Sequence, residues 1–394
     1  MRKILAGVRV LDVTQIVAGP VCTRALADLG ADVIKVDPPS DGADSNEIRR
    51  SAGPLAQNAG KRSIVIDLKS VDGAAIARRL AEAADVLVQN YRPGALAGLG
   101  LGYDVLGAAN ARLIYVTISG FGQGTRYGER GAFGATAHAE AGWLWVQQMA
   151  QGGDAPFAPG VTVADIATGM NACTAVLAAL YDREHTGHGQ EINIALMDSQ
   201  LAMLAEAAAP ALSNGRDAPW VPFRHGLQQT KDGYLAINLG APANWPRLAR
   251  AMGKPEMALP PERAAAEQLI EEWAAGVSTA EAEAALAAAG APYGVMRSIH
   301  DALDHPYFAE RGMIAELPDP LLGSVRAVSS PLFFSAASSQ PTGPAPLAGQ
   351  QTAAIMHELG YSAAEIERLL RARIVEQAAE PASNDGTPGA EGRE

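Results

Sequence analysis

The sequence lacks the features that mark metalloproteins, disulfide-stabilised secreted proteins and membrane proteins. It has only two cysteines, Cys22 and Cys173, which lie far apart in apolar, helix-like stretches. No CxxC or Cys/His metal spacing exists, so we expect buried free thiols and no metal. No segment has about 18 uninterrupted apolar residues, and the N-terminus has no apolar signal-peptide core. We therefore expect a cytoplasmic protein without a membrane partner.

Positive charge is also scarce. Lys and Arg total 31 against 43 Asp and Glu, which gives a net charge of −12. A broad nucleic-acid surface needs clustered cations to neutralise phosphates, so we expect no nucleic-acid partner. Any anionic ligand must instead meet a local group of cations.

Two catalytic motifs are missing. The turn after the first predicted strand reads DVTQIVAGP (12–20), where a dinucleotide-binding protein would carry GxGxxG. No G-x-S-x-G nucleophile elbow occurs. His138, in an Ala-rich helix-like stretch, and His185 and His188, at a predicted helix end, form no ligand cluster. These absences disfavour an NAD-dependent oxidoreductase and a serine hydrolase.

What the sequence does have is an alternation of short β-branched runs with helical patterns. This alternation predicts an α/β fold with a parallel sheet. We predict strands at 7–13, 32–37, 63–68, 85–90 and 112–119, with helices that include 73–84.

The pattern changes near residue 215, and the length of 394 residues allows two or three domains. Residues 1–221 are predicted to form the first part of a large domain and residues 222–320 a smaller α+β domain, with a hairpin arm at 230–239 and helices at 245–290. Residues 321–376 are predicted to return to the large domain. Residues 377–394 are rich in Ala, Gly, Pro and Glu and are predicted to be a disordered tail.

The run VTVADIATGM (161–170) contains one acidic residue, Asp165, before a long apolar helix predicted from Ile166 to about His185 and ended by Gly187. Aspartate is a good N-cap, because its carboxylate accepts hydrogen bonds from free helical N–H groups, and sequence physics favours that role. The same N–H groups would stabilise a nucleophilic carboxylate. The residues alone leave both roles open.

Two stretches could bind an anion. NAGKRSIVIDLK (58–69) brings Lys61, Arg62 and Lys69 near the ends of a predicted strand. QNYRPGAL (89–96) follows another strand, where Tyr91 could stack on a base and Arg92 could pair with a phosphate. The alternatives are solvated surface cations and a strand-ending turn.

Several stretches together resemble one family. They are LAGVRVLDVTQIVAGPVCTRALADLGADVIKVDPP, NAGKRSIVIDLK, ADVLVQNYRPGALAGLGLGYDVL, VADIATGMNACTAVLAALYDREHTGHGQEINIALMDS and APYGVMRSIHDALDHPYFAERGM. The chain resembles the family III (CaiB/BaiF) CoA-transferases, which include formyl-CoA transferase, carnitine CoA-transferase and the related α-methylacyl-CoA racemases.

The resemblance implies an interlocked homodimer in which each chain has a large Rossmann-like domain and a small domain. It implies coenzyme A transfer from an acyl-CoA to a small carboxylic acid, through aspartyl anhydride and aspartyl-CoA thioester intermediates. Asp165 stands at the place of the nucleophile. The implied coenzyme contacts are Ile16, Val17, Ile66, Lys69, Asn90, Tyr91 and Arg92.

The sequence departs from the family pattern at several positions, among them Pro38 and Pro39, which replace a basic residue after the second strand. Val17 replaces a glutamine of formyl-CoA transferase, which counts against formyl-CoA and oxalate as substrates. Gly98 replaces a frequent arginine of the coenzyme phosphate site. Phe133 and Gly134 stand where the racemases have their His and Asp. A transferase is therefore favoured over an acyl-CoA racemase or isomerase of the same fold and over a non-catalytic acyl-CoA-binding member.

Overall fold

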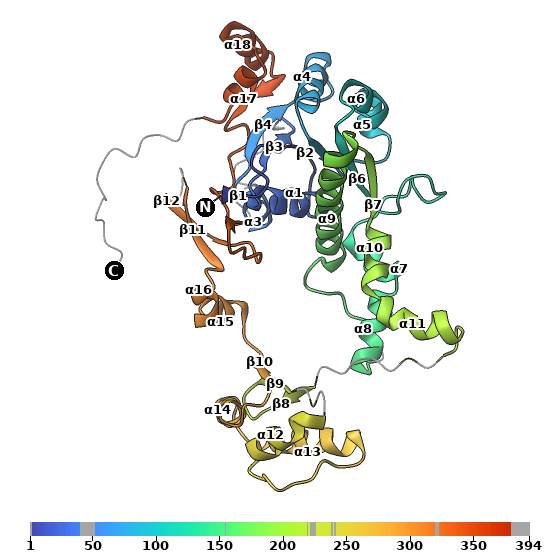
Figure 1. Ribbon diagram of the computed structural model, residues 1–394, viewed down its shortest axis with the longest axis vertical. Helices are drawn as coiled ribbons and strands as arrows, with labels where there is room; N and C mark the ends of the chain where they lie inside the picture. The colour runs from blue at the N-terminus through green and yellow to red at the C-terminus, as the bar shows by residue number, and fades with distance from the viewer. Residues whose placement is uncertain are drawn as a thin grey trace, which may run out of the picture. The chain divides into compact units, whose positions relative to one another are not determined.

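The structure, a computed structural model, describes residues 2–39, 52–153, 155–218, 220, 226–237, 239, 242–319 and 323–379 (Figure 1). The chain divides into two compact units. Unit 1 comprises residues 1–147, 155–209 and 311–394, and unit 2 comprises residues 148–154 and 210–310. The domain boundaries predicted from the sequence were 222 and 320. Nearly all of the predicted disordered tail, from residue 380, lies outside the described residues.

Unit 1 is built on a seven-stranded sheet in the order β14-β4-β3-β2-β5-β6-β7. Neighbouring strands are parallel except for β14, which runs antiparallel to β4. The predicted α/β fold with a parallel sheet is confirmed. The strands are β2 (Arg9–Val13), β3 (Asp32–Asp37), β4 (Arg62–Ile66), β5 (Val86–Gln89), β6 (Ile114–Ser119), β7 (Glu191–Ala195) and β14 (Val375–Glu376).

This strand order positions the site. The chain builds outward from β2 through β3 to β4 and then returns to place β5 on the other side of β2. In open α/β sheets, ligands bind where the order reverses, outside the carboxyl ends of the strands. The sheet therefore predicts a crevice beside the residues that follow β2 and β5.

Helices cover both faces of the sheet, so most strand side chains are buried. One core contains Leu11, Ile34, Ile64 and Leu87, and the other contains Val10, Val33, Val86 and Ile114. The helices that lie wholly or partly in unit 1, whether or not they cover the sheet, are α1 (Ala18–Asp28), α3 (Ala52–Asn58), α4 (Val71–Glu82), α5 (Ala95–Gly98), α6 (Tyr103–Ala109), α7 (Gly134–Glu140), α8 (Trp143–Gln151), α9 (Val163–Thr186), α10 (Leu196–Met203), α11 (Ala205–Asn214), α17 (Thr352–Glu358) and α18 (Ala363–Arg371).

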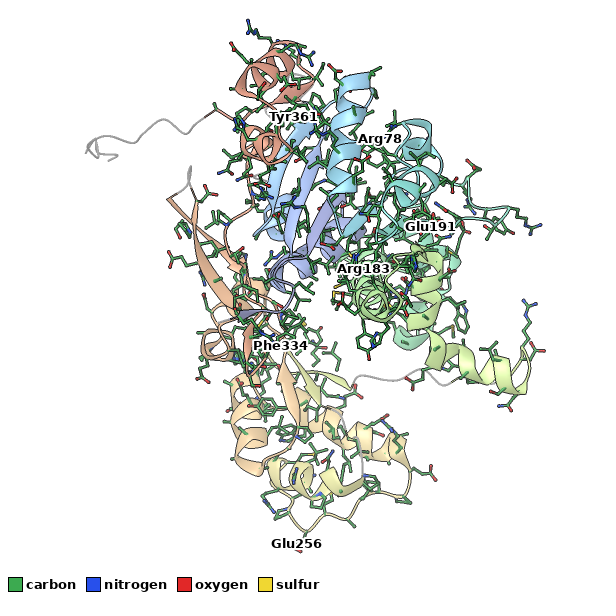
Figure 2. All side chains as sticks on the ribbon, turned by 45° about the horizontal axis from the view of Figure 1, so that its top comes forward. Arg78, Arg183, Glu191, Glu256, Phe334 and Tyr361 are labelled. Carbon is green, nitrogen blue, oxygen red and sulfur yellow. The ribbon has the colours of Figure 1, made fainter. Side chains whose placement is uncertain are left out.

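The helix α9 packs against α1 in the second core, where the two free thiols Cys22 and Cys173 are buried as predicted. Within the described part of the chain it is the one helix long and apolar enough to span a membrane, but half of its most apolar window is buried inside the protein. Its Arg183, labelled in Figure 2, is also buried and pairs with Asp85 at 2.9 Å. These contacts are those of a core helix.

The helix α9 begins earlier than the sequence predicted. Its N-cap is Thr162, and Asp165 is the third helical residue, so the prediction of Asp165 as the N-cap is wrong. Within the helix, the hydroxyl of Thr168 donates to the carbonyl of Ala164 at 2.6 Å. The predicted end is confirmed, because Gly187 takes a left-handed conformation with φ of 76°.

Other short strands complete unit 1. The strands β1 (Arg2–Lys3) and β13 (Ala337–Ser338) pair in parallel, and β11 (Ile314–Asp319) pairs antiparallel with β12 (Gly323–Val328). The antiparallel pairing of β14 with β4 brings Val375 beside Ile66. Segments from both ends of the described chain thus belong to unit 1.

Unit 2 has a small antiparallel sheet, β8 (Leu227–Gln229), β9 (Tyr234–Ile237) and β10 (Tyr293–Val295). The hairpin expected around 230–239 is therefore present. Its core includes Leu235, Trp245 and Leu286. The helical elements are η1 (Pro242–Asn244), α12 (Trp245–Ala251), α13 (Arg263–Ala275), α14 (Thr279–Ala289), α15 (Ile299–Leu303) and α16 (Pro306–Glu310).

Candidate active site

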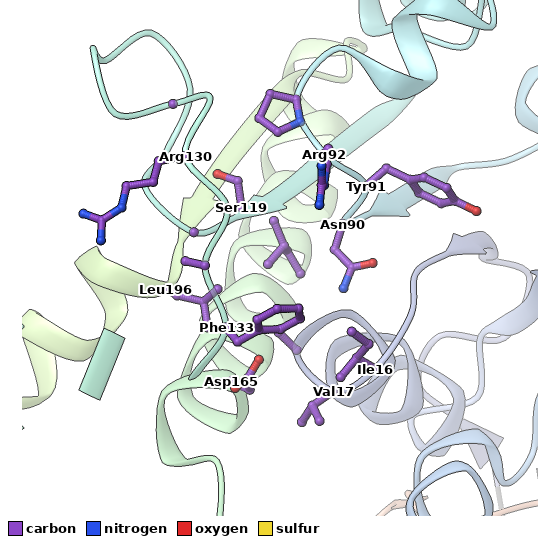
Figure 3. A pocket seen from close by; sticks show the side chains of 17 residues that line it. Ile16, Val17, Asn90, Tyr91, Arg92, Ser119, Arg130, Phe133, Asp165 and Leu196 are labelled. Carbon is purple, nitrogen blue, oxygen red and sulfur yellow. The ribbon is translucent and has the colours of Figure 1, made fainter. Parts of the chain in front are cut away.

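A cavity of about 180 Å³ lies in unit 1 at the place where the strand order reverses (Figure 3). Its walls come from the residues after β2, β5 and β6, the loop before α7, the first turn of α9 and the start of α10. The lining residues are Ile16, Val17, Ala18, Asn90, Tyr91, Arg92, Pro93, Ile118, Ser119, Gly120, Gly128, Arg130, Gly131, Ala132, Phe133, Asp165 and Leu196. Most are apolar or glycine, and one carboxylate is among them.

That carboxylate is Asp165, which is 9% exposed. Burial raises its pKa above the usual value, while hydrogen bonds from its own backbone N–H and from that of Gly134 act in the opposite direction. Gly134 lies so close that an added Cβ would stand 2.1 Å from Oδ2 of Asp165. The site therefore holds one partly desolvated carboxylate in a fixed orientation.

The turn after β2 forms a second wall under backbone strain. Ile16 adopts φ of 69°, a left-handed conformation that a β-branched residue rarely takes, and its side chain is 65% exposed. Asn90 holds this turn, since Gln15 donates its N–H to Oδ1 at 2.8 Å and accepts from Nδ2 at 2.7 Å. The turn after β2 is thereby tied to the turn after β5.

A buried ion pair supports the same turn from below. Lys61 Nζ lies 2.9 Å from Asp12 Oδ2, and it also donates to Thr23 and Asn58. Burial would raise the pKa of Asp12, but Lys61, Lys35 and the hydroxyls of Thr14 and Thr23 hold it well below its usual range. Burial lowers the pKa of Lys61 to about 8 against the attraction of Asp12. Asp12 also accepts the N–H of Thr14 at 3.0 Å, which fixes the start of the turn.

The anion site predicted at residues 58–69 is therefore only partly available. Lys61 forms a buried ion pair with Asp12. Arg62 forms ion pairs with Asp32 at 2.6 Å and with Glu358 at 2.6 Å. Lys69 remains exposed after β4. The interpretation of all three as ligand-binding surface cations is wrong for Lys61, because its side chain is buried against Asp12, Thr23 and Asn58.

Two arginines line the cavity, and they differ in whether a carboxylate pairs with them. Arg130 forms an ion pair with Glu140, at 2.9 Å for one of its two contacts, and lies over the ring of Phe121 at 4.8 Å. Arg92 is exposed and has no ion-pair partner among the residues that the structure describes.

The structure brings together six of the eight site residues predicted from the sequence. Ile16, Val17, Asn90, Tyr91, Arg92 and Asp165 all line the cavity. Ile66 and Lys69 do not. Ile66 is buried in the core with 1% exposure, and Lys69 follows β4, two strands from β2. An added Cβ at Gly98 would meet nothing within 4 Å, so the space of the family's arginine stays open.

Other lining residues were missed. Ser119 is the last residue of β6 and Leu196 directly follows β7, and the rule that ligands bind at carboxyl ends of parallel strands could have found them. Arg130 and Gly131 lie in a loop with no recognisable signal. Among the described residues, no group of three His, Cys, Asp or Glu side chains is placed to hold a metal ion.

Comparison with known proteins shows to which family the chain with this cavity belongs. The sequence profile of CoA-transferase family III matches residues 5–352. The chain belongs to CoA-transferase family III. Its relatives are named as enzymes, and this protein is accordingly a family III CoA-transferase with coenzyme A as co-substrate.

Two curated relatives cover nearly the whole chain. A succinyl-CoA:glutarate CoA-transferase of Mus musculus is 33% identical over 95% of this chain and 91% of its own length. A formyl-CoA:oxalate CoA-transferase of Streptomyces avermitilis is 31% identical over 95% of this chain and 100% of its own. The crystal structure of a CaiB/BaiF family protein from Brucella suis is also similar, with 32% identity, a TM-score of 0.77 and coverage of 91% and 100%.

We expect Gly134→Ala to lower the turnover of this CoA-transferase about 100-fold, because the methyl group would overlap Oδ2 of Asp165 and force the carboxylate aside. The matched control is Gly131→Ala, on the same cavity wall, where an added Cβ meets nothing within 4 Å. Steady-state kinetics of both variants, with thermal unfolding to confirm the fold, test this. Equal turnover in the two variants would show that Asp165 tolerates displacement.

Proposed function

We propose that this enzyme moves coenzyme A from an acyl-CoA donor to a carboxylic acid acceptor, with Asp165 as the covalent nucleophile. The observation that carries the proposal is the buried Asp165 carboxylate, bonded to two backbone N–H groups, in a cavity at the reversal point of a Rossmann-type sheet. A carboxylate is the group that can exchange acyl partners with both a thioester and a free acid.

The proposed reaction is a series of acyl transfers. An oxygen of Asp165 attacks the carbonyl carbon of the donor thioester, and the coenzyme leaves as a thiolate. The thiolate attacks the Asp165 carbonyl carbon of the resulting anhydride, which releases the donor acid and leaves an aspartyl-CoA thioester. The acceptor carboxylate then displaces the thiolate to form a second anhydride. The thiolate takes the acceptor acyl group and restores the Asp165 carboxylate.

The N–H groups of Gly134 and Asp165 can serve every step. They hold the carboxylate before attack, and the same donors are placed to stabilise negative charge on the Asp165 oxygen while the anhydride and thioester break down. Attack requires the ionised carboxylate, and burial raises the pKa of Asp165. We therefore expect turnover to fall as the pH decreases through that raised pKa.

The coenzyme contacts carried over from the family fit the cavity in part. The strained turn at Ile16 and Val17 and the residues Asn90 to Arg92 border it, so the acyl end of the coenzyme can lie between them. Arg92, which has no ion-pair partner among the described residues, offers a cation for a coenzyme phosphate or the carboxylate of an acid. Lys69 and the backbone near Ile66, at the same sheet edge, are proposed contacts of the nucleotide part.

Incubation with an acyl-CoA and a panel of free acids, followed by mass spectrometry of the CoA esters, tests the transfer. The first donors are succinyl-CoA and formyl-CoA, with glutarate and oxalate among the acceptors, because the two curated relatives are named for these compounds. Val17 predicts weaker activity with the formyl-CoA and oxalate pair. Donor alone should leave coenzyme A attached to the peptide that contains Asp165.

Other outcomes would favour other activities of the fold. Deuterium exchange at the α-carbon of an acyl-CoA without any acceptor would indicate a racemase or isomerase. Coenzyme binding without exchange on any acid of the panel would indicate a non-catalytic member. Phe133 and Gly134 supply no acid or base for the racemase alternative.

We also propose that two copies of the chain form a homodimer. The helix α9 leaves Ile166, Met170, Leu177 and Tyr181 half-exposed or exposed, the last at 72%. Their spacing places them on one face of the helix, and a second copy would cover that face. Light scattering should give a dimer mass for the wild type and a smaller mass when Met170 and Leu177 are both replaced by Glu. A dimer mass for that variant would place the interface elsewhere.

A further inference from the structure

One backbone N–H group in the first turn of α9 hydrogen-bonds to a side chain of α7. The N–H of Val163 donates to the carbonyl of Val161 at 3.0 Å, and that of Asp165 bonds to its own carboxylate. The N–H of Ala164 donates to Nε2 of His138 at 3.1 Å. The N-cap, Thr162, contributes no side-chain hydrogen bond. His138 therefore does for α9 what the side chain of a serine or threonine N-cap usually does.

This hydrogen bond lies in an apolar environment. His138 is 3% exposed and Ala164 is fully buried, beside Leu196 and Met197 of α10. The ring of Trp143 lies 6.2 Å from the ring of His138, measured between centroids. Water cannot readily replace a lost partner there, so an unpaired Ala164 N–H would favour a shift of the helix start.

We propose that His138 is a positioning residue that aims the Asp165 carboxylate by holding the first turn of α9 against α7. The two helices are joined twice within a few residues. Gly134 donates its N–H to the Asp165 carboxylate, and His138, one helical turn later on α7, accepts from Ala164, the residue before Asp165. Losing the second bond would leave the nucleophile attached to a turn that can move. This inference rests on the proposed role of Asp165.

Only a neutral imidazole with its proton on Nδ1 can accept at Nε2, so the bond requires one tautomer. The charged groups in the first turn of α9, on α10 and on α7 are Asp165, Asp198 and Glu140, which pairs with Arg130. The other charged residues of α9, Asp182, Arg183 and Glu184, lie near its C-terminal end. None of them hydrogen-bonds to His138 within the described part of the chain. Burial lowers the pKa of His138 from 6.5, which keeps the ring neutral near neutral pH.

The test compares His138→Leu with His138→Gln. Leucine fills the space without an acceptor, and we expect kcat to fall roughly 10- to 100-fold while KM for the acyl-CoA changes little, because the turns after β2 and β5 are untouched. Glutamine offers a carbonyl oxygen, so we expect it to recover most of the lost kcat. At acidic pH, the kcat of His138→Gln should also no longer include the decrease that protonation of His138 causes in the wild type. His188→Leu is the matched control, since His188 is exposed in the loop after α9.

Nitrogen NMR of the wild-type imidazoles, with His138→Gln to identify the signal, gives a readout independent of turnover and of the leucine variant folding. We expect a proton on Nδ1, an unprotonated Nε2 at neutral pH and a pKa below 6.5. The opposite tautomer, or a kcat for a folded His138→Leu equal to that of His188→Leu, would overturn the inference. Full activity of Asp165→Asn would instead overturn the proposed nucleophile, so the two failures are distinguishable.

Discussion

Replacing Asp165 by asparagine is expected to lower turnover at least about a thousandfold and to leave the fold intact. An amide is isosteric with the carboxylate and can still accept the N–H of Gly134, but it does not attack a thioester. The same substitution at Asp182, exposed near the far end of α9, is the matched control. Turnover should be measured on protein whose intact mass confirms that the new asparagine has not deamidated.

The same variant should not lose stability. Burial raises the pKa of Asp165, which means that the folded state disfavours the ionised form relative to the unfolded chain. At neutral pH the charge is therefore a cost to folding, and a neutral side chain removes it. We expect the melting temperature of Asp165→Asn to equal or exceed that of the wild type. A clear decrease would mean that the carboxylate supports α9 more than it burdens the fold.

Replacing Lys61 by methionine should give the largest loss of stability, roughly 3–5 kcal/mol. The methionine fills the space, but Asp12 is left as a buried carboxylate without its closest cation. Urea unfolding measures the change. The control is Lys69→Met, which removes an exposed lysine beyond β4 and should change the free energy of unfolding by no more than about 0.5 kcal/mol.

A second substitution tests the cause. Asp12→Asn removes the orphaned charge, so the double variant with Lys61→Met should be more stable than Lys61→Met alone. If the changes in unfolding free energy of the two single variants add up to that of the double variant, Asp12 and Lys61 are not coupled. Acid should also weaken the wild type, because the depressed pKa of Asp12 contributes stability above about pH 4 that is lost as the pH falls toward the folded-state value.

The sheet could be predicted from the sequence because each strand has a local signal in its own residues and in the turns that bound it. The strand β3 occupies the predicted residues 32–37, since a β-branched run bounded by a glycine turn and two prolines has few alternatives. The neighbouring strands agree to within a few residues. The two turns that border the cavity follow from the same pattern, because both come directly after a strand.

The start of α9 could not be predicted in this way. Thr162 and Asp165 are both favourable N-cap residues, and the local sequence does not choose between them. The choice depends on His138, which the fold brings from 26 residues away to bond with Ala164. Lys61 was misinterpreted for the same reason, because its partner, Asp12, lies 49 residues earlier in the chain. Contacts between residues this far apart in the sequence are set by the tertiary fold and leave no local signal.

The pairing of β14 with β4 has a consequence for how the protein is made. During synthesis, β4 leaves the ribosome more than 300 residues before its outer neighbour, so its edge stays unpaired while unit 2 is translated. An open strand edge is a template for pairing with other chains. The core of unit 2 comes from one continuous stretch of the sequence, so this unit can fold before the last strand of unit 1 has been synthesised. The pairing that covers this edge of the large sheet is therefore a late, long-range event.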